Sequence, residues 1–110
     1  MQQYDVPSLV ESDPKSNITD LLLERAAKTP NLPLYAVQTD VDGVWDNVSA
    51  VDFLGQVRTL AKGFIAAGVQ PGQRVAIMGH TSYEWTLVDL ALWFAGAVSV
   101  PIYETSSASQ

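Results

Sequence analysis

The residues best able to do chemistry lie in one short turn, Gly79-His80-Thr81-Ser82, between an apolar strand and a helix. Turns at this position can bind phosphate groups, because the backbone N–H groups of a helix start point at the ligand. A dinucleotide-binding turn needs three glycines at set spacing, and a P-loop needs a lysine after its last glycine. This turn has one glycine and no lysine. We therefore expect an ordinary strand-to-helix turn, with a weak anion or substrate contact as the alternative.

Two isolated titratable residues, His80 and Asp89, are further candidates. His80 is the only histidine, so no metal site with a pair of histidines and no Ser–His–Asp triad is predicted. The chain has no cysteine, so no cysteine metal site and no thiolate nucleophile is predicted either. Asp89 lies within an apolar helix, where a carboxylate must find a partner or face solvent on a thin polar stripe with Thr86. We expect His80 to be structural or solvated and Asp89 to be structural, with a functional role for His80 and general acid–base catalysis by Asp89 as the alternatives.

Two tryptophans and the C-terminal tail also have a structural interpretation. Trp85 and Trp93 are eight residues apart, hence on one helical face, and are expected in the core. Residues 105–110 (TSSASQ) lack the glycine and lysine of a phosphate loop and are expected to start a helix. The residues alone therefore predict no catalytic, cofactor-binding or metal-binding residue.

The composition is that of one small globular domain. Of 110 residues, 47% are apolar, 9% aromatic and 16% charged, whereas disordered chains have few aromatics and far more charge. The net charge is -6 and the six basic residues are scattered, which argues against nucleic-acid binding. We see no signal peptide and no apolar stretch long enough for a transmembrane segment, and therefore expect a cytoplasmic protein.

Periodicity and helix caps predict an α/β fold. Residues 1–15 are expected to form an extended lead-in, and residues 16–110 one domain. The domain should contain a helix capped at Ser16-Asn17, a β-hairpin of strands 34–39 and 44–48, and a long helix between Ser49 and Gly68. A strand at 74–79, a helix at 83–95 capped by Ser82 and a strand at 98–103 then predict a parallel βαβ unit. Its helix is apolar almost all round, which is typical of burial on more than one side.

Three stretches resemble the N-terminal part of bacterial long-chain fatty-acid–CoA ligases, which are adenylate-forming enzymes. They are residues 43–49 (GVWDNVS), residues 68–77 (GVQPGQRVAI) and residues 83–108, which run from YEW to AGAVSVPIYETSSA. The last run is the most specific, and the resemblance covers about residues 17–110. Gln73 stands where the family usually has Asp, and His80-Thr81-Ser82 occupies a loop where many relatives have an Asn-containing turn.

The resemblance implies the incomplete N-terminal portion of a large adenylate-forming (AMP-binding) domain. It implies a parent enzyme that joins a fatty acid to coenzyme A through an acyl-adenylate, using ATP and Mg²⁺, and it allows a homodimer. The family's phosphate loop, ribose-binding Asp and C-terminal Lys are expected beyond Gln110, so no catalytic residue is carried over onto this chain. The alternatives are an adenylate-forming enzyme for another carboxylic acid, such as an amino acid, and a non-catalytic α/β interaction module.

Overall fold

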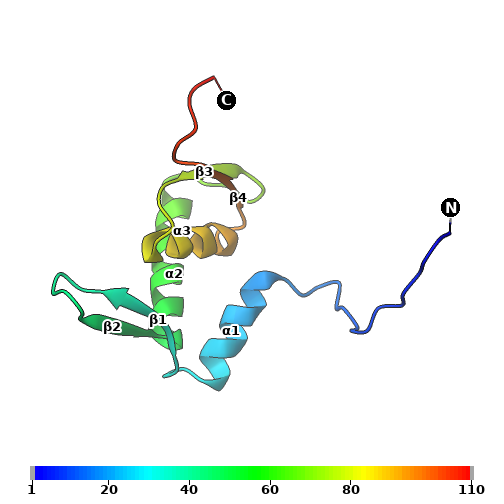
Figure 1. The fold of residues 1–110 in the computed structure, drawn as a ribbon, viewed down its shortest axis with the longest axis horizontal. Coiled ribbons are helices and arrows are strands. Elements are labelled where there is room, and N and C mark those ends of the chain that lie inside the picture. Colours follow the sequence, from blue (N-terminus) through cyan, green and yellow to red (C-terminus); the bar gives the residue numbers. More distant parts are fainter. Residues whose placement is uncertain (1, 110) are drawn as a thin grey trace.

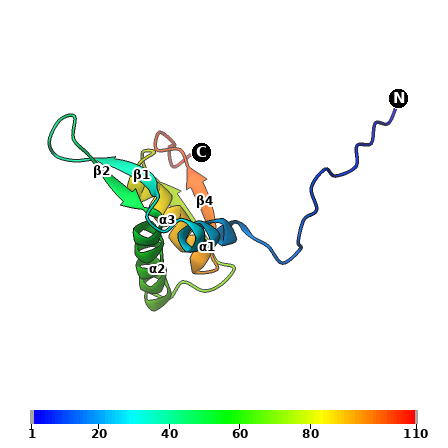
Figure 2. The ribbon, with the colours of Figure 1, turned by 90° about the horizontal axis from the view of Figure 1, so that it is seen from below.

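The computed structural model describes residues 2–109 and has the predicted mixed α/β architecture (Figure 1). In chain order the elements are α1 (Ile18–Lys28), β1 (Pro33–Gln38), β2 (Trp45–Ser49), α2 (Ala50–Ala66), β3 (Arg74–Met78), α3 (Tyr83–Phe94) and β4 (Val98–Ile102). The predicted order of helix, hairpin, long helix and βαβ unit is thereby confirmed, with boundaries that differ by one or two residues. Residues 2–17 form no helix or strand and run away from the packed elements (Figures 1 and 2).

Each helix begins at a side chain that the sequence predicts as its cap. The Asn17 side chain accepts a hydrogen bond from the Thr19 backbone N–H at 3.0 Å. Ser49 Oγ accepts one from the Asp52 N–H at 3.2 Å, and Ser82 Oγ one from the Trp85 N–H at 3.1 Å. These bonds satisfy N–H groups that have no partner within the helix, which fixes where each helix starts.

The strands form two separate two-stranded sheets. β1 and β2 pair antiparallel around a turn in which Gly43 has a φ of 76°, a value that glycine adopts readily. β3 and β4 pair in parallel, with Ala76 opposite Val100. The parallel pairing, on which the predicted βαβ unit depends, is confirmed.

The hydrophobic core lies along one face of α2. Phe53 and Val57 are almost fully buried there, together with Leu22 and Ala26 from α1 and Ala91 from α3. Burying a side chain such as Phe or Val contributes about 1.5–3 kcal/mol to stability. The hairpin lies across the start of α2, where the Tyr35 ring packs 4.7 Å from the Phe53 ring, measured between centroids.

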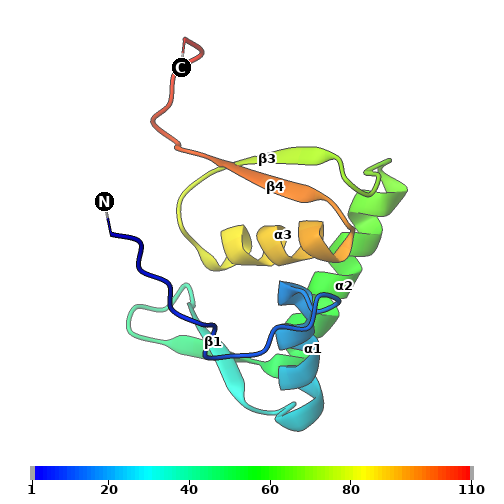
Figure 3. The same cartoon turned by 90° about the vertical axis from the view of Figure 1, so that its right-hand side faces the viewer.

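α3 lies between two apolar clusters, as its composition predicts. On one side it packs on α2 and α1, and on the other Leu92 packs with Ile77 and Ala97 from the β3–β4 unit (Figure 3). Only Glu84 among its twelve residues is exposed. The opposite, outer face of the β3–β4 sheet leaves apolar side chains exposed: Met78, Val98, Val100 and Ile102.

The tail forms turns and no helix up to Ser109. Ser106 N–H donates to the Tyr103 carbonyl at 2.9 Å, which closes one of these turns. A helix beginning in this segment stays a prediction, and Gln110 lies outside the described residues.

Candidate functional site

The turn at residues 79–82 lies at the carboxyl end of β3, beside the carboxyl end of β4. In open parallel sheets this end of the strands is where ligands bind. The turn is nevertheless committed to local structure, because the Ser82 side chain caps α3 and its carbonyl accepts a hydrogen bond from Thr86 Oγ1 at 3.3 Å. The Ser82 hydroxyl oxygen therefore accepts from the backbone of α3, and its position is set by this capping role.

An ion pair links the two strand ends. His80 Nδ1 lies 2.5 Å from Glu104 Oε2, which joins the turn after β3 to the segment after β4. The His80 side chain is 86% exposed, so the pair contributes little to stability. Sequence reasoning did not anticipate this pair, because its two residues lie twenty-four positions apart and only the parallel register brings them together.

A cavity of about 400 Å³ lies beside this ion pair. Its lining residues come from both strand ends and the first turn of α3: Gly79, His80, Thr81, Trp85, Pro101, Ile102, Tyr103 and Glu104. The walls combine aromatic and apolar groups with the His80 imidazole, the Thr81 hydroxyl and one carboxylate, and they contain no lysine or arginine. This arrangement can accept an apolar or planar group, but it lacks the positive charge that a triphosphate requires.

Trp85 and Trp93 do not have identical surroundings, although both are half-buried on α3. Trp93 Nε1 donates to Ser99 Oγ on β4 at 3.0 Å, which ties the end of the helix to the strand. Trp85 packs on the cluster of Ile77 and Leu92 and also forms part of the cavity wall. The expected core role is supported for Trp85, which packs on a buried cluster, whereas Trp93 is half-buried and belongs to neither apolar cluster.

Asp89 is found in neither of the two environments predicted for it. Its side chain does not face solvent on a polar stripe, since Asp89 is only 9% exposed. Nor has it found a partner, since no described residue gives its Oδ1 a hydrogen bond. That prediction is wrong because α3 packs between two apolar clusters, which buries Asp89 together with its apolar neighbours.

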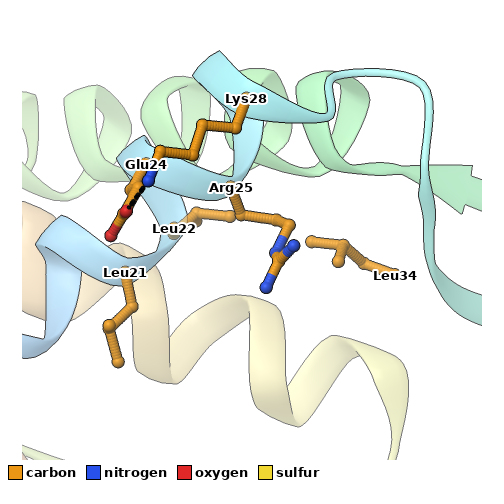
Figure 4. Close-up of a pocket in the computed structure, with 6 residues that line it drawn as sticks. All are labelled: Leu21, Leu22, Glu24, Arg25, Lys28 and Leu34. Carbon is orange, nitrogen blue, oxygen red and sulfur yellow. Dashed lines mark hydrogen bonds and ion pairs between the residues drawn. The ribbon is translucent and has the colours of Figure 1, made fainter.

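A second cavity, of about 530 Å³, lies beside α1 and β1 (Figure 4). Its lining combines leucines with charged side chains: Leu21, Leu22, Glu24, Arg25, Lys28 and Leu34. Lys28 Nζ pairs with Glu24 Oε1, and this hydrogen bond and the lysine charge lower the pKa of Glu24. Arg25 extends into the space between α1 and Leu34 (Figure 4) and has no ion-pair partner among residues 2–109.

A third hollow follows the exposed side of α2, where Gly55, Thr59 and Gly63 form a row of small residues. A methyl group on either glycine would meet nothing within 4 Å. The row leaves space beside α2, but no charged or polar group in the described chain is buried at it.

The described residues do not fit a metal ion. No three His, Cys, Asp or Glu side chains come together in residues 2–109 in a way that could hold one. Mg²⁺ is implied by the resemblance alone, and these residues offer it no set of ligands. Within the same part of the chain, no helix is both long and apolar enough to cross a membrane.

Comparison with known proteins decides the family. The AMP-binding enzyme family matches residues 22–110. The chain belongs to the AMP-binding enzyme family. It is 40% identical over 110 residues to the long-chain-fatty-acid–CoA ligase FadD15 of Mycobacterium bovis, covering all of this chain and 18% of that protein. A shorter match, 41% identical over 64 residues, links it to the long-chain-fatty-acid–CoA ligase ACSBG2 of Xenopus laevis, covering 58% of this chain and 9% of that protein.

Solved structures of AMP-binding enzymes share the fold. A putative long-chain-fatty-acid CoA ligase from Rhodopseudomonas palustris superposes with a TM-score of 0.71 at 28% identity, over 84% of this chain and 22% of that one. The N-terminal subdomain of Klebsiella oxytoca NpsA in complex with 3-hydroxyanthranilyl-AMSN superposes with a TM-score of 0.69 at 25% identity, over 84% of this chain and 22% of that one. The predicted family resemblance and fold class are thus confirmed. The chain spans less than a fifth of the length of FadD15.

Proposed function

We propose that this AMP-binding chain is the N-terminal part of an ATP-dependent long-chain fatty-acid–CoA ligase. The supporting observation is the 40% identity to a long-chain-fatty-acid–CoA ligase over all 110 residues. In the proposed reaction, the fatty-acid carboxylate attacks the α-phosphorus of ATP and pyrophosphate leaves. The sulfur of coenzyme A then attacks the acyl carbonyl, loses its proton, and displaces AMP. The substrates are thus a fatty acid, ATP and coenzyme A, with Mg²⁺ as the nucleotide's cation.

Within this proposal, none of the 110 residues is catalytic, cofactor-binding or metal-binding. Stabilising charge at a phosphorus centre takes preorganised N–H donors and cations. The cavity at the strand ends offers one ion pair and no lysine or arginine, and the chain carries a net charge of -6. The catalytic groups are therefore proposed to lie in a part of the enzyme outside these residues.

The proposed organisation is a lead-in at residues 1–15 and the N-terminal portion of the AMP-binding domain at residues 16–110. The proposed location is the cytoplasm, where ATP and coenzyme A are both available.

A homodimer is proposed as the assembly. Its support is the apolar outer face of the β3–β4 sheet, because exposed apolar surface of this kind favours association. Sedimentation at several protein concentrations tests the dimer, and a monomer at every concentration would reject it.

ATP–pyrophosphate exchange with palmitate tests the function. We expect exchange by the full-length protein and none by the 110-residue chain. Exchange by the 110-residue chain would place the chemistry inside it. Absence of exchange by the full-length protein with any fatty acid would reject the ligase.

A different acid substrate is the second candidate. It is favoured by the likeness to NpsA, whose solved N-terminal subdomain is in complex with 3-hydroxyanthranilyl-AMSN. The same exchange assay with 3-hydroxyanthranilate in place of palmitate separates the two functions, because only the acid that is activated drives exchange. Membership of the family argues against the non-catalytic interaction module.

A further inference from the structure

Asp89 is the buried polar residue whose environment the proposed reaction leaves unexplained. It is 9% exposed in the middle of α3, and its Oδ1 has no hydrogen-bond partner among the described residues. Buried carboxylates in native proteins are paired or hydrogen-bonded, because removing the charge from water without a partner is costly. A partner from elsewhere is therefore required if the protein holds Asp89 ionised here.

Two donors near Asp89 along α3 are already used, and Trp85 Nε1 donates no hydrogen bond to Oδ1. Trp93 Nε1 donates to Ser99 Oγ at 3.0 Å, and Thr86 Oγ1 donates to the Ser82 carbonyl at 3.3 Å. The ion pairs of the described chain, Lys28 with Glu24 and His80 with Glu104, involve other carboxylates. The described residues thus supply no cation to Asp89.

The positions around Asp89 indicate which chemistry would fit. Trp85 and Trp93 lie four residues before and after it, one helical turn away on either side, and therefore on the same face of α3. A carboxylate with a tryptophan one helical turn away on either side suits a guanidinium, which pairs with carboxylates through two parallel N–H bonds and also stacks on aromatic faces. A metal ion does not fit, because the described residues hold no cluster of three metal-ligating side chains.

We propose that Asp89 binds an arginine located in the part of the protein outside these 110 residues, and that this pair fastens α3 to the rest of the domain. This inference shares one premise with the proposed function, namely that these residues are part of a longer protein. The premise is supported by the match to FadD15, of which the chain covers 18%. Trp85 and Trp93 cover the two sides of the pair, and the arginine supplies the hydrogen bond that Oδ1 lacks.

The sign of a mutational effect tests this proposal. Removing one partner of a buried ion pair leaves the other charge buried and destabilises the fold, whereas removing a buried charge without a partner does not. In the full-length protein, Asp89→Asn and the volume-conserving Asp89→Leu should each raise the unfolding equilibrium constant at least tenfold. In the 110-residue chain, the same substitutions should leave that constant unchanged or lower it. Ser99→Ala is the control, since its partner Trp93 is within the chain and its effect should have the same sign in both proteins.

Each other outcome overturns the proposal. Stabilisation by Asp89→Leu in the full-length protein would mean that Asp89 has no ionic partner at all. Destabilisation in both proteins would place the partner inside the chain, and Arg25 on the neighbouring helix α1 is then the first to examine.

Double-mutant cycles in the full-length protein decide the question even if the 110-residue chain does not fold. We expect no coupling of Asp89→Asn with Arg25→Gln, Arg58→Gln or Arg74→Gln, and coupling with substitution of one arginine elsewhere. Coupling with a lysine would reject the guanidinium. All these experiments measure unfolding stability and not catalysis. Their results are therefore independent of the exchange assay that tests the ligase function.

Discussion

The Tyr83 hydroxyl donates a hydrogen bond to Gln56 Oε1 at 2.6 Å, which joins the first turn of α3 to the second turn of α2. The Tyr83 ring also lies 5.5 Å from the Tyr35 ring and 6.0 Å from the Phe53 ring, measured between centroids. One side chain therefore connects the hairpin, the long helix and the βαβ unit. Its ring and its hydroxyl stabilise the fold in ways that substitutions can separate.

Tyr83→Phe should cost much less stability than Tyr83→Ala. The phenylalanine keeps the ring cluster and loses only a hydrogen bond near solvent, for which we expect a loss of about 0.5 kcal/mol. The alanine also loses the aromatic packing, for which we expect about 2–4 kcal/mol. Urea unfolding monitored by tryptophan fluorescence measures both. Equal losses for the two variants would show that the hydroxyl, and not the ring, holds the elements together.

Alkaline pH should destabilise the protein through the two tyrosines of this cluster. Burial raises the pKa of Tyr35 and of Tyr83 above the usual 10.0. The folded state therefore favours the neutral phenols, and the stability they contribute is present below pH 10 and lost as pH rises through the folded-state pKa values. The unfolding free energy, measured from pH 9 to 11.5, should fall less steeply in the Tyr35→Phe, Tyr83→Phe double variant.

The control for the alkaline series is Tyr103→Phe, which changes an exposed ring. We expect it to follow the unsubstituted protein across the whole pH range. A double variant that follows the unsubstituted protein equally closely would contradict the assignment of the loss to the buried tyrosines.

Phe53→Ala should be among the most damaging single changes in the chain. Phe53 is 2% exposed at the centre of the α2 core, so its truncation leaves a cavity and removes its burial. We expect a loss of about 3–5 kcal/mol in unfolding free energy. Arg58→Ala, on the exposed side of the same helix, should change stability by less than about 0.5 kcal/mol. Similar losses at both positions would contradict the placement of the core along one face of α2.

The elements of this fold could be predicted from local sequence because each begins or ends at a residue with a local physical role. Asn17, Ser49 and Ser82 cap the helices as predicted, and Gly68 has the positive φ, 102°, expected after α2. The apolar composition of α3 likewise predicted burial on both sides. These features depend on residues a few positions apart.

What the sequence did not reveal depends on contacts between distant residues. His80 and Glu104 meet only because β3 and β4 pair in parallel and end side by side. The burial of Asp89 depends on neighbouring side chains whose orientations periodicity does not give. The turn after β3 was a candidate from its position alone, but the cavity beside it also requires residues 101–104, which only the parallel pairing of β3 and β4 brings next to it.

Removing residues 2–15 should leave the stability of the remainder unchanged. This lead-in contains no helix or strand, and its apolar side chains at Tyr4, Leu9 and Val10 are more than three-quarters exposed. It therefore contributes little burial to the 110-residue chain. The thermal unfolding midpoints of the shortened chain and of the 110-residue chain should agree within about 1 °C. A loss of 1 kcal/mol would lower the midpoint of a domain of this size by several degrees. A markedly lower midpoint for the shortened chain would contradict a boundary at residue 16.

Two glycine-to-alanine substitutions should have opposite signs. Gly96 follows α3 with a φ of 80°, and a Cβ added to it would lie 3.3 Å from the Pro71 Cβ. The Gly96 carbonyl also accepts a hydrogen bond from the Gly72 N–H at 2.8 Å. The left-handed backbone alone costs a non-glycine residue about 1–2 kcal/mol, and the close approach to Pro71 adds to it.

Gly63, by contrast, lies within α2, and a Cβ there would meet nothing within 4 Å. Alanine at Gly63 should stabilise the helix by up to about 1 kcal/mol. Urea unfolding of Gly96→Ala and Gly63→Ala measures both shifts under one condition. Destabilisation by Gly63→Ala would mean that the hollow beside α2 is filled in solution, and neutrality of Gly96→Ala would mean that the turn joining α3 to β4 relaxes away from Pro71.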